Sequence, residues 1–546
     1  MPLRILGYHY MKFDMNYTRT LAMRTFTFLL VFFCSFIAAF AQNWDWGGPI
    51  DPLQAKMKIR HYRLELELLP ESQSIQGSNT ITFSADEKLD TLRFQLIDEY
   101  EVSKVLMDGK EVQFSHQNDL LDIIPIDCTC DQIQIFYGGK TPIAQNPPWT
   151  GGFTWEKDQL DNYWMGLSSQ GEGGKIFMPA LDHPSSEPSE GVDLFFTAPK
   201  PYFVASNGRL IEQEEEDQKT TYHWQTTYPI SNYNINFTLG IFHEEKMDFK
   251  SVSGEVIPMQ VWVLQENRSK AKELLELLKI STETQEKYFG PFPFPQDKIA
   301  VVETPYLGME HQTINAYGNN FQFVPMGKVK YDWLLHHELG HEWWGNKVTV
   351  SDWADMWIHE GLTAFGDWLY YWEHGGPEAY FEKARAEAKR LPHAKPVVSP
   401  VNSTEEEAYH GEIYSKGAMV IHSLRGVLGD ELFFPAIKAF VMDERFTYLN
   451  QVTTKDFTDF IQSYTDKDLK GFFDLYLYTT NLPKLKVSKK GKDGWLISLQ
   501  GIDFEMPLEI ETSEGVQRMP IGKKGIEVKS KTLPVVDPRG WLMLAR

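Results

Sequence analysis

The sequence predicts a multidomain α+β protein with a β-rich N-terminal domain, a mainly helical middle and a small C-terminal β domain. With 546 residues, the chain is long enough for about three or four domains of roughly 150 residues each. Apolar and polar residues alternate in the first part, recur with a helical period in the middle, and alternate again after Leu482. The composition, 42% hydrophobic and 23% charged with three cysteines, excludes a disordered polymer, a collagen-like repeat and a disulfide-stapled miniprotein.

The charge balance argues against nucleic acid as a partner. The chain carries 53 Lys and Arg against 75 Asp and Glu, a formal net charge of -22, and its basic residues form no cluster along the sequence. An evenly acidic surface is more typical of solubility than of a particular partner.

Residues 1–41 are predicted to be a secretory signal peptide. The apolar run Phe26–Phe40 follows two arginines and is about 15 residues long, which is short for a membrane span. It ends in a small-x-small site that predicts cleavage after Ala41 and export to the periplasm or the medium, with no stable membrane span left. A complete signal peptide also begins at Met23, so the initiator is either Met1 or Met23. If translation starts at Met23, residues 1–22 are not translated.

Two other readings of this segment are disfavoured. An uncleaved anchor conflicts with the short apolar length, and a lipoprotein at Cys34 conflicts with the bulky residues that precede it. Cleavage would remove Cys34 and leave Cys128 and Cys130, which we expect to be free thiols. Two cysteines are too few for a thiolate zinc cage.

Strand patterns dominate residues 42–250, the expected N-terminal β-rich domain. Apolar residues occupy every second position in two early runs, namely Tyr62, Leu64, Leu66, Leu68 and Leu92, Phe94, Leu96. A Pro/Gly-rich stretch at Asn146–Gly152 interrupts the pattern, which resumes near Leu194 and alternates again over Tyr233–Leu239.

Residues 251–482 are the expected catalytic domain, and residues 483–546 the small C-terminal β domain. A helix that ends at Gly290 is predicted by apolar or small residues on one face, namely Ala271, Leu274, Leu275, Leu278 and Thr282. Helical patterns continue to about residue 480, with a strand-like run at Ile299–Val302. In the last part the alternating residues are Trp495, Ile497, Leu499, Leu508 and Ile510.

The five residues His337–His341 have the spacing of a metal-binding helix. The run His-Glu-Leu-Gly-His lies inside a helical pattern over about residues 331–344, so His337 and His341 project from one face, one turn apart. Glu338 would then point beside a metal held by the two imidazoles, which suits a general base for an activated water.

A third metal ligand is expected at Glu360. It follows His341 after 18 intervening residues, in a second helical pattern, and two histidines plus one carboxylate with an open fourth position make a catalytic zinc site. The neighbouring histidines are poorer candidates. The one-turn partner of His336 is a glycine, and His359 would point away from the site of Glu360.

These motifs resemble those of the M1 zinc aminopeptidases, a gluzincin family that includes aminopeptidase N and leukotriene A4 hydrolase. Besides the zinc motif, Leu307–His311 resembles the family's Gly-x-Met-Glu-Asn exopeptidase motif, with Met309 and Glu310 intact but Leu307 and His311 in place of Gly and Asn. The resemblance spans nearly all of the chain after the signal. It implies a thermolysin-like α/β catalytic domain that binds one Zn²⁺ per chain.

The resemblance also implies a site for the substrate amine. Glu310 is a carboxylate suited to pair with an ammonium group, and desolvation would strengthen that pairing. In the family a Gln or Glu nine residues before the Pro of a Pro-x-x-Asp segment completes the site. Here that Pro is Pro179, and the matching residue is Gln170.

A tyrosine is expected to stabilise the transition state. The segment Tyr409–Gly417 resembles the family's Tyr-x-Lys-Gly segment, which implies that the Tyr414 hydroxyl donates to the oxyanion and gives Tyr409 a supporting role. Five tryptophans near the metal helices are expected to pack the core rather than to contact substrate, namely Trp333, Trp343, Trp344, Trp353 and Trp357.

The expected function is that of a zinc-dependent aminopeptidase acting on peptides with a free N-terminus, by a zinc-activated water with Glu338 as general base. A thermolysin-like endopeptidase, an epoxide hydrolase and a non-catalytic binding protein are the alternatives. The large helical domain of longer relatives is expected to be absent, because about 64 residues follow Leu482, and the cleft should be more open. The preferred N-terminal residue and the oligomeric state stay open.

Overall fold

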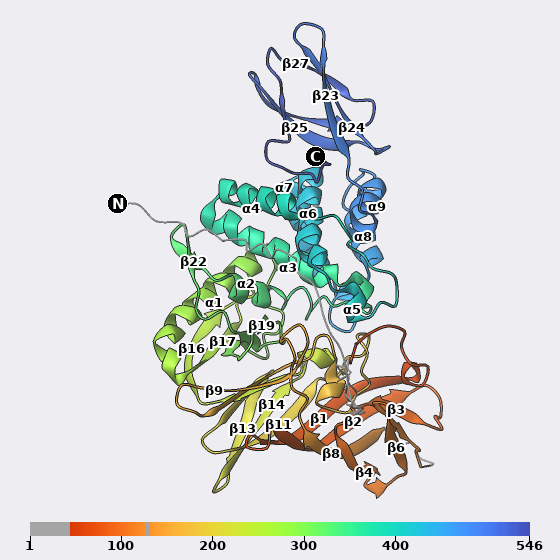
Figure 1. Cartoon of the computed structure of the whole chain (residues 1–546), viewed down its shortest axis with the longest axis vertical. Coiled ribbons are helices and arrows are strands. Elements are labelled where there is room, and N and C mark those ends of the chain that lie inside the picture. Colours follow the sequence, from red (N-terminus) through yellow and green to blue (C-terminus); the bar gives the residue numbers. More distant parts are fainter. Residues whose placement is uncertain (1–43, 127–130, 546) are drawn as a thin grey trace, which may run out of the picture. The chain divides into compact units, whose positions relative to one another are not determined.

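The computed structural model describes residues 44–126 and 131–545. The expected signal peptide, Cys128 and Cys130 lie outside the described residues. Among the helices within these ranges, none is long and apolar enough to cross a membrane. The predicted order of a β-rich part, a helical part and a second β-rich part is confirmed (Figure 1).

The described residues of the N-terminal part form three sheets. The largest has the strand order β13 (Arg209–Glu215), β14 (Lys219–Thr226), β11 (Val192–Pro199), β1 (Met57–Leu69), β2 (Ser74–Ala85), β8 (Gln132–Lys140), β4 (Glu101–Met107) and β5 (Lys110–Glu111). The second has the order β12 (Phe203–Ser206), β15 (Phe237–Gly240), β10 (Tyr163–Ser168) and β9 (Gly152–Lys157). The third has the order β3 (Leu92–Gln95), β7 (Leu120–Ile123) and β6 (Phe114–Gln117).

The sequence pattern predicted the inward face of β1 correctly but not the strand at Tyr233–Leu239. The apolar residues of β1 from Tyr62 to Leu68 are all buried, as expected for a half-buried strand. Around the predicted strand Tyr233–Leu239, only Phe237–Gly240 is a strand, and Asn232–Asn234 is a short 3-10 turn. Its asparagines do not face solvent, because they are buried and bond to neighbouring segments. The Asn236 side chain, for example, donates to the Leu167 carbonyl at 2.7 Å.

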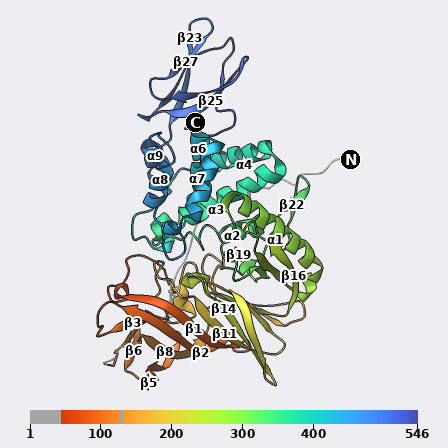
Figure 2. The same ribbon diagram turned by 180° about the vertical axis from the view of Figure 1, so that it is seen from behind.

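A five-stranded sheet lies beneath the catalytic helices. Its order is β16 (Phe242–Lys250), β17 (Val256–Leu264), β18 (Ile299–Glu303), β20 (Asn315–Tyr317) and β19 (Gly308–Met309). The three middle strands are parallel, while β16 and β19 run antiparallel at the two edges. Helix α1 (Arg268–Phe289) packs on β17 and on β16, beside which it lies in Figure 2. It ends at Gly290, whose φ of 95° favours glycine, as predicted.

The remaining helices carry or surround the site. They are α2 (Trp333–Gly340), α3 (Trp357–Tyr370), α4 (Pro377–Arg390), α5 (Glu405–Ala408), α6 (Gly411–Leu428), α7 (Asp430–Met442), α8 (Thr454–Gln462) and α9 (Lys470–Tyr478). A hairpin of β21 (Val324–Met326) and β22 (Val329–Tyr331) leads into α2. Helix α2 is shorter than the predicted 331–344, because Asp332 caps its first turn by accepting from the Leu334 and Leu335 amides.

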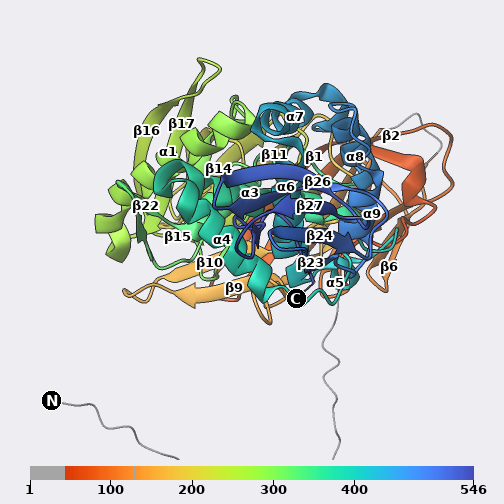
Figure 3. The same ribbon diagram turned by 90° about the horizontal axis from the view of Figure 1, so that it is seen from above.

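The C-terminal part is a pair of small sheets, as expected. One sheet has the order β23 (Lys484–Lys490), β24 (Gly494–Gln500) and β27 (Ile526–Lys529), and the other β26 (Gly515–Ile521), β25 (Met506–Thr512) and β28 (Val535–Val536). Strand β25 contacts α6, and the Tyr476 hydroxyl of α9 donates to the Met543 carbonyl at 3.0 Å. Figure 3, seen from above, shows strands β24, β26 and β27 of these sheets over α6. The buried apolar side chains of these sheets and of the catalytic helices form one continuous core.

Candidate metal and substrate site

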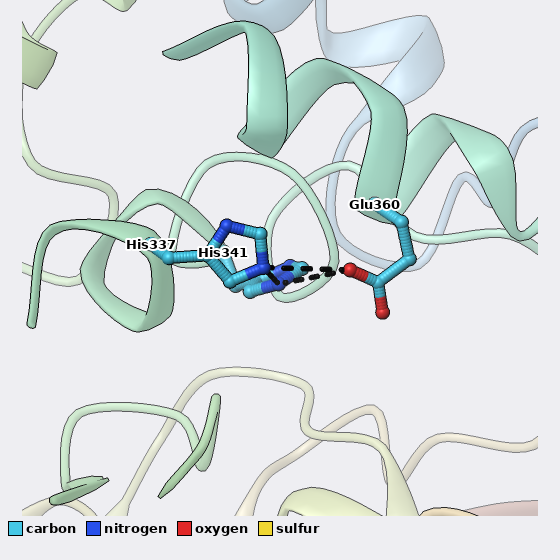
Figure 4. A group of neighbouring side chains, drawn as sticks. All are labelled: His337, His341 and Glu360. Atoms are coloured by element: carbon cyan, nitrogen blue, oxygen red, sulfur yellow. Dashed lines mark hydrogen bonds and ion pairs between the residues drawn. The ribbon is translucent and has the colours of Figure 1, made fainter. Parts of the chain in front are cut away.

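Three side chains that the sequence predicted as metal ligands converge on one point (Figure 4). His337 lies in helix α2 and His341 directly follows it, and their Nε2 atoms are 3.3 Å apart. Helix α3 brings Glu360 Oε2 to 3.4 Å from His341 Nε2 and 3.6 Å from His337 Nε2. The two histidines, one turn apart, and the carboxylate from α3 therefore meet at one point, as the spacing predicted.

The three atoms fit a zinc ion. Ligands at about 2.0–2.1 Å in a tetrahedron stand about 3.3–3.4 Å from one another, which is close to the three observed separations. Glu360 Oε2 is buried and has no hydrogen-bond partner among the described residues, as is expected of an oxygen reserved for a cation. Two imidazoles and one carboxylate are also the donor set of a catalytic zinc site.

The other ring nitrogens of the two histidines are held by neighbouring groups. His337 Nδ1 lies 2.9 Å from Asp367 Oδ2, and His341 Nδ1 lies 2.9 Å from the Trp344 carbonyl oxygen. Each ring then donates from Nδ1 and keeps Nε2 as the metal-facing acceptor. Asp367 was missed by the sequence reasoning, although it stands two helical turns after Glu360 on the same face of α3.

Glu338 lies beside the candidate metal ligands. Oxygen atoms of Glu338 and Glu310 and a ring nitrogen of His341 all lie within 4.8 Å of one another. Burial raises the pKa of the Glu338 carboxyl, and the nearby charge of Glu310 raises it further. Gly308 of β19 faces this carboxylate, because a Cβ at that position would stand 2.9 Å from Glu338 Oε1.

The two residues expected to bind the substrate amine are in direct contact. Gln170, just after β10, donates from Nε2 to Glu310 Oε1 at 2.8 Å. A third residue, Tyr233, donates its hydroxyl to the same oxygen at 2.9 Å. The sequence reasoning missed Tyr233, because the alternating pattern there indicated only a strand residue. All three side chains are buried, and burial raises the pKa of Glu310.

The two tyrosines from the downstream motif also reach the site. Their hydroxyl oxygens lie 2.6 Å apart, and the Tyr414 ring stacks on His337 with 6.0 Å between ring centroids. Burial raises the pKa of Tyr414 well above its usual value of 10, so the phenol stays protonated and can donate a hydrogen bond. Tyr409 and Tyr414 are therefore in direct hydrogen-bond contact.

A cavity of about 360 Å³ opens onto these groups. Besides the residues above, its walls include Pro148, Trp149, Leu307, Trp333 and Leu334. The expectation that Trp333 packs the core is wrong, because this side chain is 45% exposed and lines the cavity. It is the first residue of α2, one turn before His337, so it shares the metal-facing side of the helix. The other four tryptophans are buried, as expected.

Three further histidines nearby are not placed as metal ligands. His359 Nε2 accepts from the Val350 amide at 3.0 Å, and the His336 ring is buried 3.2 Å from the Gln285 amide nitrogen. His311 lies 3.1 Å from the Asn236 side-chain nitrogen. Burial lowers the pKa of His359 and His311 to about 3 and that of His336 to about 4, so these rings are neutral.

Two family models match the chain. The Peptidase M1 N-terminal domain matches residues 58–234, and the Peptidase family M1 domain matches residues 273–476. The leucyl aminopeptidase of Saccharolobus solfataricus is 21% identical over 455 residues, covering 80% of this chain and 55% of the relative. The glutamyl aminopeptidase of Rattus norvegicus is 26% identical over 335 residues, covering 57% of this chain and 34% of the relative. The chain thus spans about half the length, or less, of these curated relatives.

Solved structures share the fold. An M1 zinc metallopeptidase from Deinococcus radiodurans superposes with a TM-score of 0.66 at 20% identity, covering 78% of this chain and 95% of that chain. A second crystal structure, of a mutant of that protein bound to a Tyr-Ser-Ala substrate, matches equally well, with the same TM-score and coverage.

Proposed function

The chain belongs to peptidase family M1, and on that premise we propose that it is a zinc-dependent aminopeptidase that removes the N-terminal residue from peptides. The observation that carries the proposal is the short distance between the expected amine-binding carboxylate and the metal-facing groups. Carboxylate oxygens of Glu310 and Glu338 lie within 4.8 Å of each other and of a metal-facing histidine nitrogen.

This spacing selects the first peptide bond. The amine nitrogen and the carbonyl carbon of one residue are about 2.5 Å apart, given standard bond lengths and angles. An ammonium bound at Glu310 therefore brings only the carbonyl of its own residue next to Glu338. The next carbonyl along an extended chain lies about 3.3–3.6 Å further on, outside this cluster.

Each group of site residues then has its own role in the reaction. His337, His341 and Glu360 would hold zinc, which when bound polarises the carbonyl oxygen and makes water a better nucleophile. Glu338 accepts the proton of the attacking water and passes it to the leaving amine. The Tyr414 hydroxyl donates to the carbonyl oxygen as negative charge develops, and Tyr409 holds that hydroxyl in place.

A panel of aminoacyl fluorogenic substrates, each compared with its N-acetylated form, tests the proposal. We expect hydrolysis of the free-amine substrates, loss of activity with a chelator, and recovery with zinc. Equal rates on free and acetylated peptides would instead favour an endopeptidase. Full activity in a verified metal-free preparation would refute zinc dependence.

We also propose that the protein is exported after cleavage behind Ala41, to the periplasm or the medium. The support is the short apolar run and the small-x-small site in the sequence. Mass spectrometry of the exported protein should give an N-terminus at Gln42. An intact N-terminus upstream of Phe26 in that fraction would contradict the proposal.

A further inference from the structure

The segment Trp44–Gly48, here called the N-terminal strap, precedes the first β-strand but bonds to the catalytic part of the chain. The Glu405 amide of α5 donates to the Trp46 carbonyl at 2.8 Å, and the Gly48 amide donates to the Ser403 carbonyl at 3.1 Å. Lys175, from the N-terminal part, donates to the Asp45 carbonyl at 3.1 Å. The strap is therefore held by hydrogen bonds on both sides, two backbone bonds to the catalytic part and one lysine side chain from the N-terminal part.

The strap inserts one large side chain behind the amine site. Trp46 is 1% exposed and belongs to the catalytic core, not to the core of the β-rich part that follows it in sequence. Its ring packs edge-on against Tyr233 and Trp353, with centroid distances of 5.6 and 5.3 Å, and these two rings lie 6.0 Å from each other. Each ring of this three-membered cluster thus contacts the other two.

Close packing leaves Trp46 little freedom. A Cβ on Gly173 would stand 2.7 Å from Trp46 Cδ1, so only glycine allows the neighbouring backbone to approach this ring. Gly47 is constrained in the same way, because a Cβ there would stand 2.5 Å from Trp353 Cδ1. Both glycines have a positive φ, 81° and 93°, that favours glycine.

The cluster is linked to the substrate site by the Tyr233 hydroxyl. Tyr233 packs its ring on the two tryptophans and donates its hydroxyl to Glu310 Oε1. Glu310 directly follows β19, a two-residue strand at the sheet edge, so its side-chain donors contribute much of its orientation. A tilt of the Tyr233 ring would move or break this bond.

We propose that Trp46 of the N-terminal strap is a positioning residue of the amine site, which holds Glu310 through Tyr233. The proposal rests on the proposed aminopeptidase function. Its physical basis is that a misplacement of about 1 Å in a substrate-positioning group can cost about a hundredfold in rate. Truncation of Trp46 leaves a void beside Tyr233, into which that ring can turn.

The test measures kcat/KM on a free-amine substrate and on its N-acetylated form for Trp46→Ala, Trp46→Phe and Tyr233→Phe. We expect Trp46→Ala to lower the free-amine value about tenfold or more and to lower the ratio of free to acetylated rates, with zinc content unchanged. Trp46→Phe should restore part of the ratio. Trp44→Ala is the matched control on the strap, because Trp44 packs on the core of the β-rich part, and it should leave the ratio unchanged.

A double-mutant cycle tests whether Trp46 affects substrate binding through Tyr233. If Trp46 acts through Tyr233, then Trp46→Ala combined with Tyr233→Phe should be no worse on the free amine than Tyr233→Phe alone. Additive losses, or a fall in both substrate rates with an unchanged ratio, would overturn the proposal. If Trp46→Ala does not fold, the same cycle and the same criteria apply to Trp46→Phe.

The two proposals fail in different ways. A wild-type protein without preference for free amines would contradict the proposed function. A wild-type protein with that preference, unchanged in the Trp46 variants, would contradict only the role of the strap.

Discussion

Glu338 differs from the three metal-facing residues in that its loss should affect chemistry and not metal binding. Glu338→Gln keeps the shape of the side chain but cannot accept a proton, so we expect kcat to fall on the order of a hundredfold or more. The zinc content, measured by elemental analysis, should stay at one ion per chain. Turnover near the wild-type rate in a zinc-loaded variant would show that another group is the base.

Glu310 should determine the preference for a free N-terminus. A charge-assisted pairing of this kind contributes about 1.5–3 kcal/mol, so Glu310→Ala should lower kcat/KM on unblocked substrates about ten- to a hundredfold. Acetylated peptides, which lack the ammonium, should lose far less. The measurement is the ratio of kcat/KM on the unblocked substrate to kcat/KM on its acetylated form. An equal decline on both substrates would make Glu310 a structural carboxylate.

Asp367 should tune metal affinity without touching the metal. Removing the group that holds the imidazole of a metal ligand typically costs about 10- to 100-fold in affinity, so Asp367→Ala should bind zinc more weakly by that factor. Competition with a chromophoric chelator measures it. Glu373→Ala, which removes a carboxylate paired with Lys287 just beyond α3, is the control and should bind zinc as the wild type does.

At the residue level, the sequence reveals groups whose partners are close in the chain. His337 and His341 are one turn apart, so their shared face follows from helix geometry alone. Tyr233 and Asp367 were missed because their roles depend on contacts with Glu310 and His337, 77 and 30 residues away in sequence. Spacing within one element cannot indicate such contacts.

At the scale of elements, helices α3 and α6 cross at two glycines. A Cβ on Gly361 would stand 2.9 Å from the Gly417 Cα, and the reverse also holds. Gly361→Ala should therefore push apart the helices that carry Glu360 and Tyr414, lowering stability by about 1–3 kcal/mol and reducing activity. Denaturant unfolding and kcat measure the two effects.

A matched control for this crossing lies on α6 itself. Gly411 has no atom within 4 Å of its would-be Cβ, so Gly411→Ala should leave stability unchanged or raise it slightly. Equal destabilisation by both alanine variants would show that helix contact is not the cause.

The extents of elements were predicted less well than their kinds. The helix through the zinc motif ends at Gly340, four residues before the predicted end, because the chain turns there to bring Trp344 back to His341. The pattern at Tyr233–Leu239 resembled a half-exposed strand, yet its polar positions are buried between segments. Alternation reports which residues share a face and cannot report whether a polar face is covered by another part of the chain.

At the scale of the whole molecule, the catalytic helices and the C-terminal sheets share one core. Trp541 lies against Gly426 of α6, where a Cβ would stand 2.9 Å from its ring, and stacks on His422 with 4.8 Å between centroids. Trp541→Ala should lower the free energy of unfolding by about 3–5 kcal/mol. Calorimetry should show one transition for both parts, and a separate early transition of the C-terminal sheets would contradict the shared core.

The position of the strap in the sequence also determines when, during synthesis, the amine site can be completed. Trp46 and its partner Glu405 are about 360 residues apart in sequence, so this contact is among the least local in the chain. At synthesis rates of about 5–20 residues per second, about 20 to 70 s pass between the two. The Trp46 carbonyl cannot accept its bond from Glu405 before α5 exists. A nascent chain therefore acquires its amine recognition late, after most of the peptidase fold has been made.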